Sequence, residues 1–86
     1  MKITILYRKN LKMSPGKLAA QVGHAVAYVV AAGADPQASI VVLQATDKKF
    51  FEATKEPCII VKDKGLTEVE PGTATCAAFI TKDEDD

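Results

Sequence analysis

The sequence has no tryptophan, one histidine and two cysteines among its 86 residues. Cys58 and Cys76 are too few for a disulfide framework, and both lie within apolar runs, so we expect free, buried thiols in a reducing compartment. One histidine and two separated cysteines match none of the ligand spacings of zinc sites, so we expect no metal and no other cofactor. The longest apolar stretch, residues 25–34, is far shorter than the ~20 residues of a membrane span. With no signal peptide, these features predict a cytoplasmic protein that does not enter the membrane.

Carboxylates are absent from residues 1–34, which carry five cations, whereas the rest of the chain carries six cations and eleven carboxylates. This asymmetry is typical of a protein with an anion-facing surface, and phosphate is the commonest large anion. A solvated basic face with no ligand explains it equally well. The length allows one small domain, which we place at residues 1–81, followed by an acidic tail at 82–86.

Alternating helical and apolar segments predict an α/β domain of two or three layers with a mixed four-stranded sheet. Ser14 followed by Pro15 indicates the start of a long helix, which Gly33 ends. Asp47 is expected to cap a short helix that ends near residue 54. The expected strands are 2–7, which should be central, 39–45, which should be buried, 58–62 and 73–80.

The long helix carries two distinct faces. Lys17, Gln21, His24 and Tyr28 lie on one stripe about 60° wide, so a cation, an amide and an imidazole project together. Another stripe is small and uncharged, which favours either a closely packed homodimer or a helix that presents alanine to water. The residues of this small stripe are Ala20, Gly23, Ala27 and Ala31.

Asp63 follows a predicted strand at its carboxyl end, where open α/β sheets build binding crevices. If that strand neighbours the first, Asp63 and the polar stripe converge, and Asp63 could orient or deprotonate a water while Lys17 stabilises an oxyanion. Each residue also has a plainer explanation: a solvent-facing lysine, a turn aspartate, or a histidine satisfied by a backbone partner. Chemistry alone therefore leaves hydrolysis and a purely structural role open.

Two blocks of sequence resemble the type 2 peptidyl-tRNA hydrolases of archaea and eukaryotes. Residues 8–25, RKNLKMSPGKLAAQVGHA, are similar to the first signature of that family, and residues 63–75, DKGLTEVEPGTAT, are similar to the second. Together they cover about a third of the chain in the right order. Asn10 departs from the usual aspartate and Leu66 from the usual arginine, and both the second helix and the carboxyl end are shorter than in the family.

The resemblance implies hydrolysis of the ester between a peptide and the 3′ end of tRNA, with tRNA backbone contacts from the basic amino-terminal third. The alternative is an inactive domain of the same fold that binds RNA or a protein partner, and hydrolysis of another aminoacyl or peptidyl ester is a third possibility. The family's catalytic positions correspond to Lys17, Asp63, Thr67 and Thr75. Expected substrate contacts are Gln21, His24, Arg8, Lys12, Lys64 and Thr73.

Overall fold

A computed structural model describes residues 1–63 and 72–81 of the chain. Its strands form one mixed sheet in the order β2-β1-β4-β3, in which β1 pairs with β2 in parallel and β4 is antiparallel to both β1 and β3. The predicted α/β class is confirmed, and β1 is central, as expected. The elements are β1 (Lys2–Arg8), α1 (Pro15–Ala31), β2 (Ser39–Ala45), α2 (Asp47–Ala53), β3 (Ile59–Lys62) and β4 (Ala74–Thr81).

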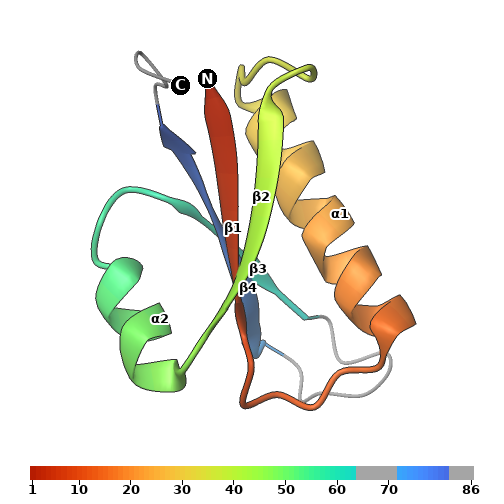
Figure 1. The fold of residues 1–86 in the computed structure, drawn as a ribbon, viewed down its shortest axis with the longest axis vertical. Coiled ribbons are helices and arrows are strands. Elements are labelled where there is room, and N and C mark those ends of the chain that lie inside the picture. Colours follow the sequence, from red (N-terminus) through yellow and green to blue (C-terminus); the bar gives the residue numbers. More distant parts are fainter. Residues whose placement is uncertain (64–71, 82–86) are drawn as a thin grey trace.

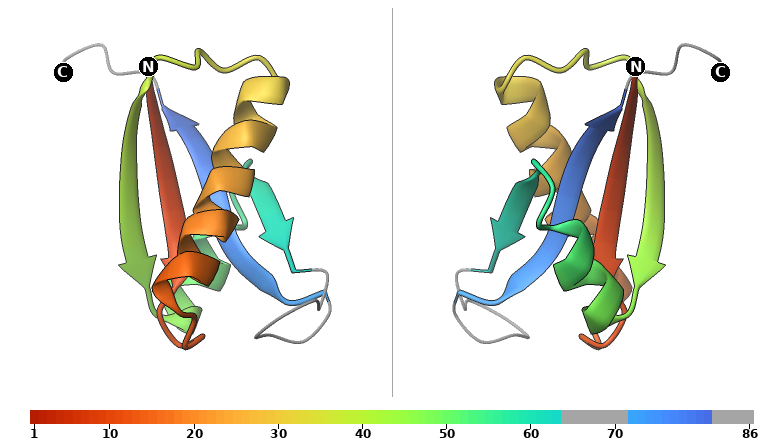
Figure 2. Two further views of the ribbon diagram at one scale, coloured as in Figure 1. Left: turned by 90° about the vertical axis from the view of Figure 1, so that its right-hand side faces the viewer. Right: turned by 90° about the vertical axis from the view of Figure 1, so that its left-hand side faces the viewer.

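The two helices cover opposite faces of the sheet, which makes the domain three-layered (Figures 1 and 2). Helix α1 crosses one face and packs mainly on β4 and β3. Helix α2 covers the other face only near the end of β1 and β2, where Phe50 is its fully buried anchor. Neither helix is long and apolar enough to cross a membrane, among the residues that the structure describes.

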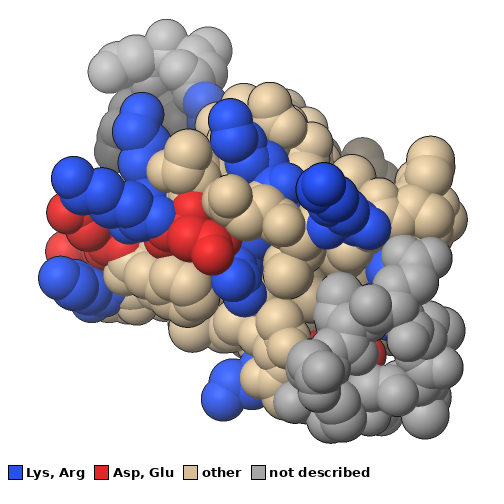
Figure 3. Space-filling model, turned by 90° about the horizontal axis from the view of Figure 1, so that it is seen from below, with Lys and Arg blue, Asp and Glu red and all other residues tan. Residues whose placement is uncertain are grey.

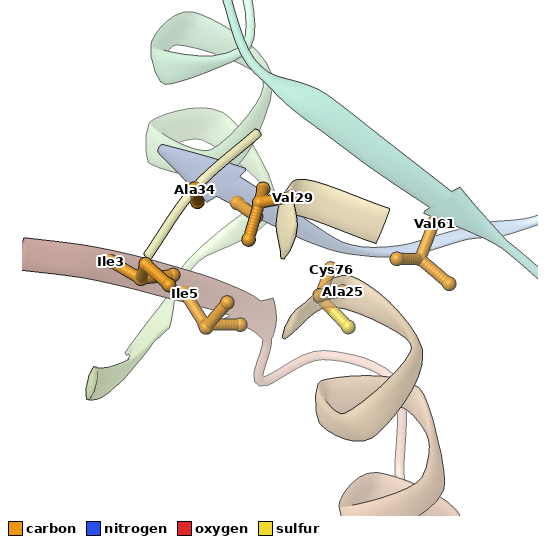
Figure 4. Close-up of a cluster of buried hydrophobic side chains, with 8 residues drawn as sticks. Ile3, Ile5, Ala25, Val29, Ala34, Val61 and Cys76 are labelled. Atoms are coloured by element: carbon orange, nitrogen blue, oxygen red, sulfur yellow. The ribbon is translucent and has the colours of Figure 1, made fainter. Parts of the chain in front are cut away.

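The main core lies between α1 and the sheet (Figure 4). Alternation along β1 directs Ile3 and Ile5 toward α1, where both are almost completely buried. Ala25 and Val29, one turn apart on α1, face them and are equally buried. This packing fixes the rotation of α1 about its axis, which decides where its polar residues point.

The boundary residues act largely as the sequence predicts. The Ser14 side chain accepts a hydrogen bond from the Lys17 backbone N–H at 3.3 Å, and Gly33 ends the helix region with a φ of +112°. The prediction of an Asp47 cap is wrong, because Thr46 caps α2 by accepting a hydrogen bond from the Lys49 N–H. Asp47 is the first helical residue, so its carboxylate is available for another partner.

The prediction that β2 is a buried strand is also wrong. Although its residues form a continuous apolar run, β2 is the edge of the sheet, and α1 lies over β4 and β3 instead. Ile40, Val42 and Leu43 are therefore 47%, 43% and 49% exposed. A continuous apolar run indicates burial on both faces only when the strand also has neighbours on both sides.

Candidate active site

The candidate site lies at the end of the sheet where β1 and β3 finish and β4 begins (Figure 1). Both strands run in the same direction because each is antiparallel to β4, so their carboxyl ends share one edge. The condition that the two strands be neighbours is not met, since β4 separates them. Helix α1 spans this gap by crossing β4 and β3, and it brings its first turns over Asp63.

Lys17 and Asp63 form an ion pair in the interior of this site. The Lys17 side chain is only 10% exposed and the Asp63 side chain 2%. Two opposite charges held together out of water offset much of the cost of burying each one, and removal of either would strand the other. The pairing that the sequence suggested for an active site is therefore present.

The ends of the segment that follows Asp63 are held together by backbone hydrogen bonds. The Asp63 N–H donates to the Thr73 carbonyl at 2.9 Å, and the Gly72 N–H donates to the Asp63 carbonyl at 2.7 Å. Gly72 has a φ of +80°, a conformation that side chains with a Cβ rarely adopt. This closure fixes the backbone of Asp63 and directs Thr73 into β4.

Gln21 and Thr75 form a second buried pair, one helical turn along α1 from Lys17. The Thr75 hydroxyl donates to Gln21 Oε1 at 2.7 Å and makes a longer contact of 3.3 Å with the Val61 carbonyl. Both side chains are buried, which is unusual for a glutamine on a helix and requires a polar partner. One turn apart on α1, Lys17 thus contacts Asp63 and Gln21 contacts Thr75.

Thr75 sits at an irregularity of the sheet. Val61 pairs with Cys76 and Lys62 pairs with Ala74, so Thr75 is an extra residue of β4 between two successive pairs. Such bulges redirect a side chain and are common beside active sites. The bulge explains how Thr75 can face α1 although the next residue of β4, Cys76, also lies in the core beneath α1, since consecutive residues of a regular strand alternate between faces.

The other two residues of the polar stripe lie away from these pairs. His24 and Tyr28 are exposed on α1 and stack on each other with ring centroids 6.2 Å apart. The stripe therefore divides: Lys17 and Gln21 turn toward the sheet, while His24 and Tyr28 face solvent. At 100° per residue Tyr28 lies between Lys17 and Gln21 around the helix, so the division follows position along α1 and not rotation about its axis.

Arg8 leaves β1 on the opposite face of the sheet and is bound by neighbouring elements. Its Nε and Nη2 donate to the two carboxylate oxygens of Asp47 at 2.9 and 2.8 Å, and Nη1 donates to the Ala74 carbonyl at 2.9 Å. The guanidinium carbon lies 4.9 Å from the ring centre of Phe51. The hydrogen bond from Arg8 is the largest cause that lowers the pKa of Asp47 below its ordinary value.

The remaining predicted contacts are divided between solvent and the part of the chain that is not described. Lys12 is exposed in the loop before α1, and Thr73, the residue directly before β4, is half-buried. Thr67 and Lys64 lie outside the described residues. Their predicted roles in catalysis and substrate binding stay predictions.

Sequence reasoning missed Asp47 as the partner of Arg8. The sequence alone carries no signal for this pair, because it depends on the parallel pairing of β1 with β2, which places Arg8 opposite Ala45, two residues before Asp47. Asn10 also has an unforeseen contact: its Oδ1 accepts a hydrogen bond from the Asp47 backbone N–H at 3.0 Å. The departure at Asn10 thus supplies a neutral acceptor beside a carboxylate that Arg8 already binds.

The two thiols are free, as expected, but they differ in burial. Cys76 is fully buried, whereas Cys58 is half-buried. Burial raises the pKa of both thiols, and a hydrogen bond with Thr75 opposes that effect at Cys76. Neither thiol has the properties of an activated nucleophile.

The two buried pairs together can bind and activate a water. A buried carboxylate accepts hydrogen bonds from water, a lysine cation stabilises negative charge on a carbonyl oxygen under attack, and a threonine hydroxyl can donate or accept. This combination suits the hydrolysis of an ester by water, with no covalent intermediate on the protein.

Comparison with known proteins agrees with this chemistry. A family model described as peptidyl-tRNA hydrolase PTH2 matches residues 1–86. A protein named peptidyl-tRNA hydrolase from Haloquadratum walsbyi is 39% identical, with 92% of this chain and 84% of the relative aligned. One of the same name from Methanopyrus kandleri is 39% identical over 87% of this chain and 79% of its own length. A third, from Methanocaldococcus jannaschii, is 32% identical, with coverages of 92% and 84%.

Proposed function

The chain belongs to the peptidyl-tRNA hydrolase PTH2 family, and we propose that its two buried pairs hydrolyse the ester that joins a peptide to tRNA. The observation that carries the proposal is the ion pair of Lys17 with Asp63 beside the hydrogen bond of Gln21 with Thr75. The products would be free tRNA and a peptide. This role in translation would place the protein in the cytoplasm.

In the proposed reaction, Asp63 orients the attacking water and accepts its proton, while Lys17 faces the carbonyl oxygen and stabilises the negative charge that develops there. Thr75 holds the water or the substrate carbonyl through its hydroxyl, and Gln21 fixes the direction of that hydroxyl. The ester C–O bond breaks, and the proton passes to the 3′ oxygen of the leaving tRNA. Thr67 is proposed to complete the site.

The proposed tRNA surface is the end of the molecule that contains the site. Exposed lysines lie there in the loop after β1 and at the start of α2, and Figure 3 shows Lys and Arg side chains spread over this end beside acidic groups. Phosphate contacts from lysines position an RNA without reading its sequence and weaken with salt. The exposed lysines are Lys9, Lys12, Lys48 and Lys49.

The test of catalysis is release of N-acetyl-aminoacyl groups from tRNA by the purified protein and by its Asp63→Asn, Thr75→Val and Lys17→Ala variants. General acid–base chemistry contributes about 10²- to 10⁴-fold, so Asp63→Asn should lower kcat by that order. Lys55→Ala, which removes an exposed lysine beyond the end of α2, is the matched control and should keep full activity. Equal rates in the wild type and the Asp63→Asn variant would contradict the proposal. Salt-dependent tRNA binding without turnover would favour the inactive RNA-binding domain.

The test of the tRNA surface compares Lys48→Ala with Lys55→Ala, since the two lysines lie near opposite ends of α2. Each lost phosphate contact should lower the slope of log affinity against log salt by about 0.7 to 0.9. We expect this change for Lys48→Ala and for Lys12→Ala, and none for Lys55→Ala. A uniform effect of all three would indicate general charge attraction instead of a defined surface.

A homodimer through α1 is proposed from its small stripe. All four residues of that stripe are exposed, and small side chains allow two helices to approach closely. Sedimentation at micromolar concentration tests this directly, and a single 9.2 kDa species would remove the proposal. The residues of the stripe are Ala20, Gly23, Ala27 and Ala31.

A further inference from the structure

The hydrogen-bonding groups of Arg8 are directed toward protein atoms on the far side of the sheet from the buried pairs. Nitrogens of its guanidinium bond Asp47 on α2 and the Ala74 carbonyl on β4, and the side chain is 14% exposed. The ring of Phe51 covers one face of the guanidinium. A cation so occupied has little left with which to bind a phosphate.

The first residues of β4 are paired with fewer residues of neighbouring strands than the rest of β4. The pairing of β1 with β4 ends at Tyr7 and Cys76, so Ala74 and Thr75 lie beyond it. On the other side, the pairing of β4 with β3 goes from Cys76 directly to Ala74 and skips Thr75. The Arg8 side chain supports the strand at this point. Its Nη1 donates to the carbonyl oxygen of Ala74, and the carbon of that carbonyl is joined to the nitrogen of Thr75 by the peptide bond.

We propose that Arg8, oriented by Asp47, is a positioning residue that holds the Thr75 bulge in place from the opposite face of the sheet. Ala74 packs with Phe50 on the α2 side of the sheet, so Arg8 can hold the Ala74 carbonyl from that side and leave the Thr75 hydroxyl free to meet Gln21 on α1. The inference rests on the proposed function, since it assigns to Thr75 a place in the hydrolytic site.

The positioning role proposed for Arg8 requires the planar, forked geometry of its guanidinium. Two parallel hydrogen bonds to one carboxylate fix the plane of the group, and the third nitrogen then points in a defined direction. A lysine at this position would keep the charge but could not hold both partners in that geometry. Charge and positioning can therefore be separated by one conservative substitution.

The kinetic experiment compares the Arg8→Lys, Asp47→Asn and doubly substituted chains on N-acetyl-aminoacyl-tRNA. A misplacement of about 1 Å at a reacting group can cost about 100-fold. We expect kcat to fall about 10- to 100-fold in both single variants, with KM and tRNA affinity unchanged. The double variant should be no slower than the worse single one, because both substitutions release the same clamp.

Lys9→Ala is the comparison variant for a lost tRNA contact, since Lys9 follows Arg8 directly, is exposed and lies on the proposed tRNA surface. Its loss should weaken tRNA binding and lower the salt dependence of that binding, whereas Lys55→Ala, outside the proposed tRNA surface, should leave both kcat and tRNA binding unchanged. The same pattern as in Lys9→Ala, found in Arg8→Lys or Asp47→Asn, would overturn the positioning role and assign Arg8 to tRNA. Wild-type kcat and KM in both variants would overturn it as well.

Amide hydrogen exchange tests the clamp without any substrate. In Arg8→Lys and in Asp47→Asn, amides of residues 74–76 should exchange faster, while those of Ile3 and Ile5 keep their wild-type rates. Unchanged exchange at 74–76 in both variants would refute the clamp even if the enzyme is active. Faster exchange in a protein with no hydrolytic activity would support the clamp and reject the proposed function, so the two failures can be told apart.

Discussion

Two ion pairs stand on opposite faces of the same end of the sheet, and they differ in how much water reaches them. In the Lys17–Asp63 pair both side chains are buried, at 10% and 2% exposure. In the Arg8–Asp47 pair the cation is 14% exposed but the carboxylate 42%. The first pair is thus shielded from water, as the proposed hydrolysis requires, whereas the second leaves its carboxylate partly in water.

The difference follows from what covers each face. Helix α1 has 17 residues and lies over β4 and β3, so groups beneath its first turns are shielded from water. Helix α2 has seven residues and covers only the end of the other face. A long helix can bury an ion pair, while a short one leaves the carboxylate of its first residue at the surface.

The largest expected effect comes from breaking the buried pair on one side. Lys17→Ala leaves the Asp63 carboxylate buried without its cation, which typically costs about 3–5 kcal/mol of unfolding free energy. Urea unfolding followed by circular dichroism measures it. Asp47→Ala, which exposes Arg8 to water instead, should cost much less.

A double substitution sharpens this result. Lys17→Met with Asp63→Leu removes both charges together and replaces them by apolar side chains of similar size, which is often neutral or stabilising. We expect the double variant to unfold near the wild-type urea concentration while hydrolysis is lost. A double variant as unstable as Lys17→Ala would show that the pair itself, and not the stranded charge, stabilises the fold.

The second expected effect concerns the hydrogen bond between Gln21 and Thr75. Gln21→Leu fills a similar volume but removes the acceptor 2.7 Å from the Thr75 hydroxyl, which keeps only its longer contact with the Val61 carbonyl. A buried polar group that loses its partner costs about 1–3 kcal/mol. Thermal unfolding measures this cost, and Gln44→Leu on exposed β2 is the matched control. An equal loss in both variants would contradict the role of the buried bond.

Much of this arrangement could be predicted from the sequence because it depends on local rules. The Ser14 cap, the Gly33 ending and the spacing of Lys17 and Gln21 are set by residues a few positions apart. The exposure of β2 and the pairing of Arg8 with Asp47 depend on strand order, which no periodicity reveals. His24 illustrates the same limit: it shares a stripe with Lys17 and Gln21 yet is exposed, since its surroundings depend on which part of the stripe other elements cover.

The third expected effect is the response of the exposed pair to acid. The hydrogen bond from Arg8 lowers the pKa of Asp47 in the folded protein, so the folded state holds its proton less strongly than the unfolded chain. The stability that this pair contributes is therefore complete above the ordinary pKa of the carboxyl and is lost as pH falls through the lowered value. Asp47→Asn should lack this part of the acid dependence. Identical profiles of unfolding free energy against pH in the wild type and Asp47→Asn would contradict it.

The smallest expected effect is a difference in reaction rate between the two thiols, which lie on opposite faces of the sheet. Cys76 belongs to the core under α1, and Cys58 packs beside Phe50 and Ala77 on the α2 side. Burial raises the pKa of each, so both should react slowly with a disulfide reagent near pH 7. Cys58 is half-buried and should react first, since the short α2 admits the reagent more often than α1 does. If Cys76 reacts as fast as Cys58, the α1 face opens as readily as the α2 face, and the contrast between the two ion pairs cannot come from the length of the covering helix.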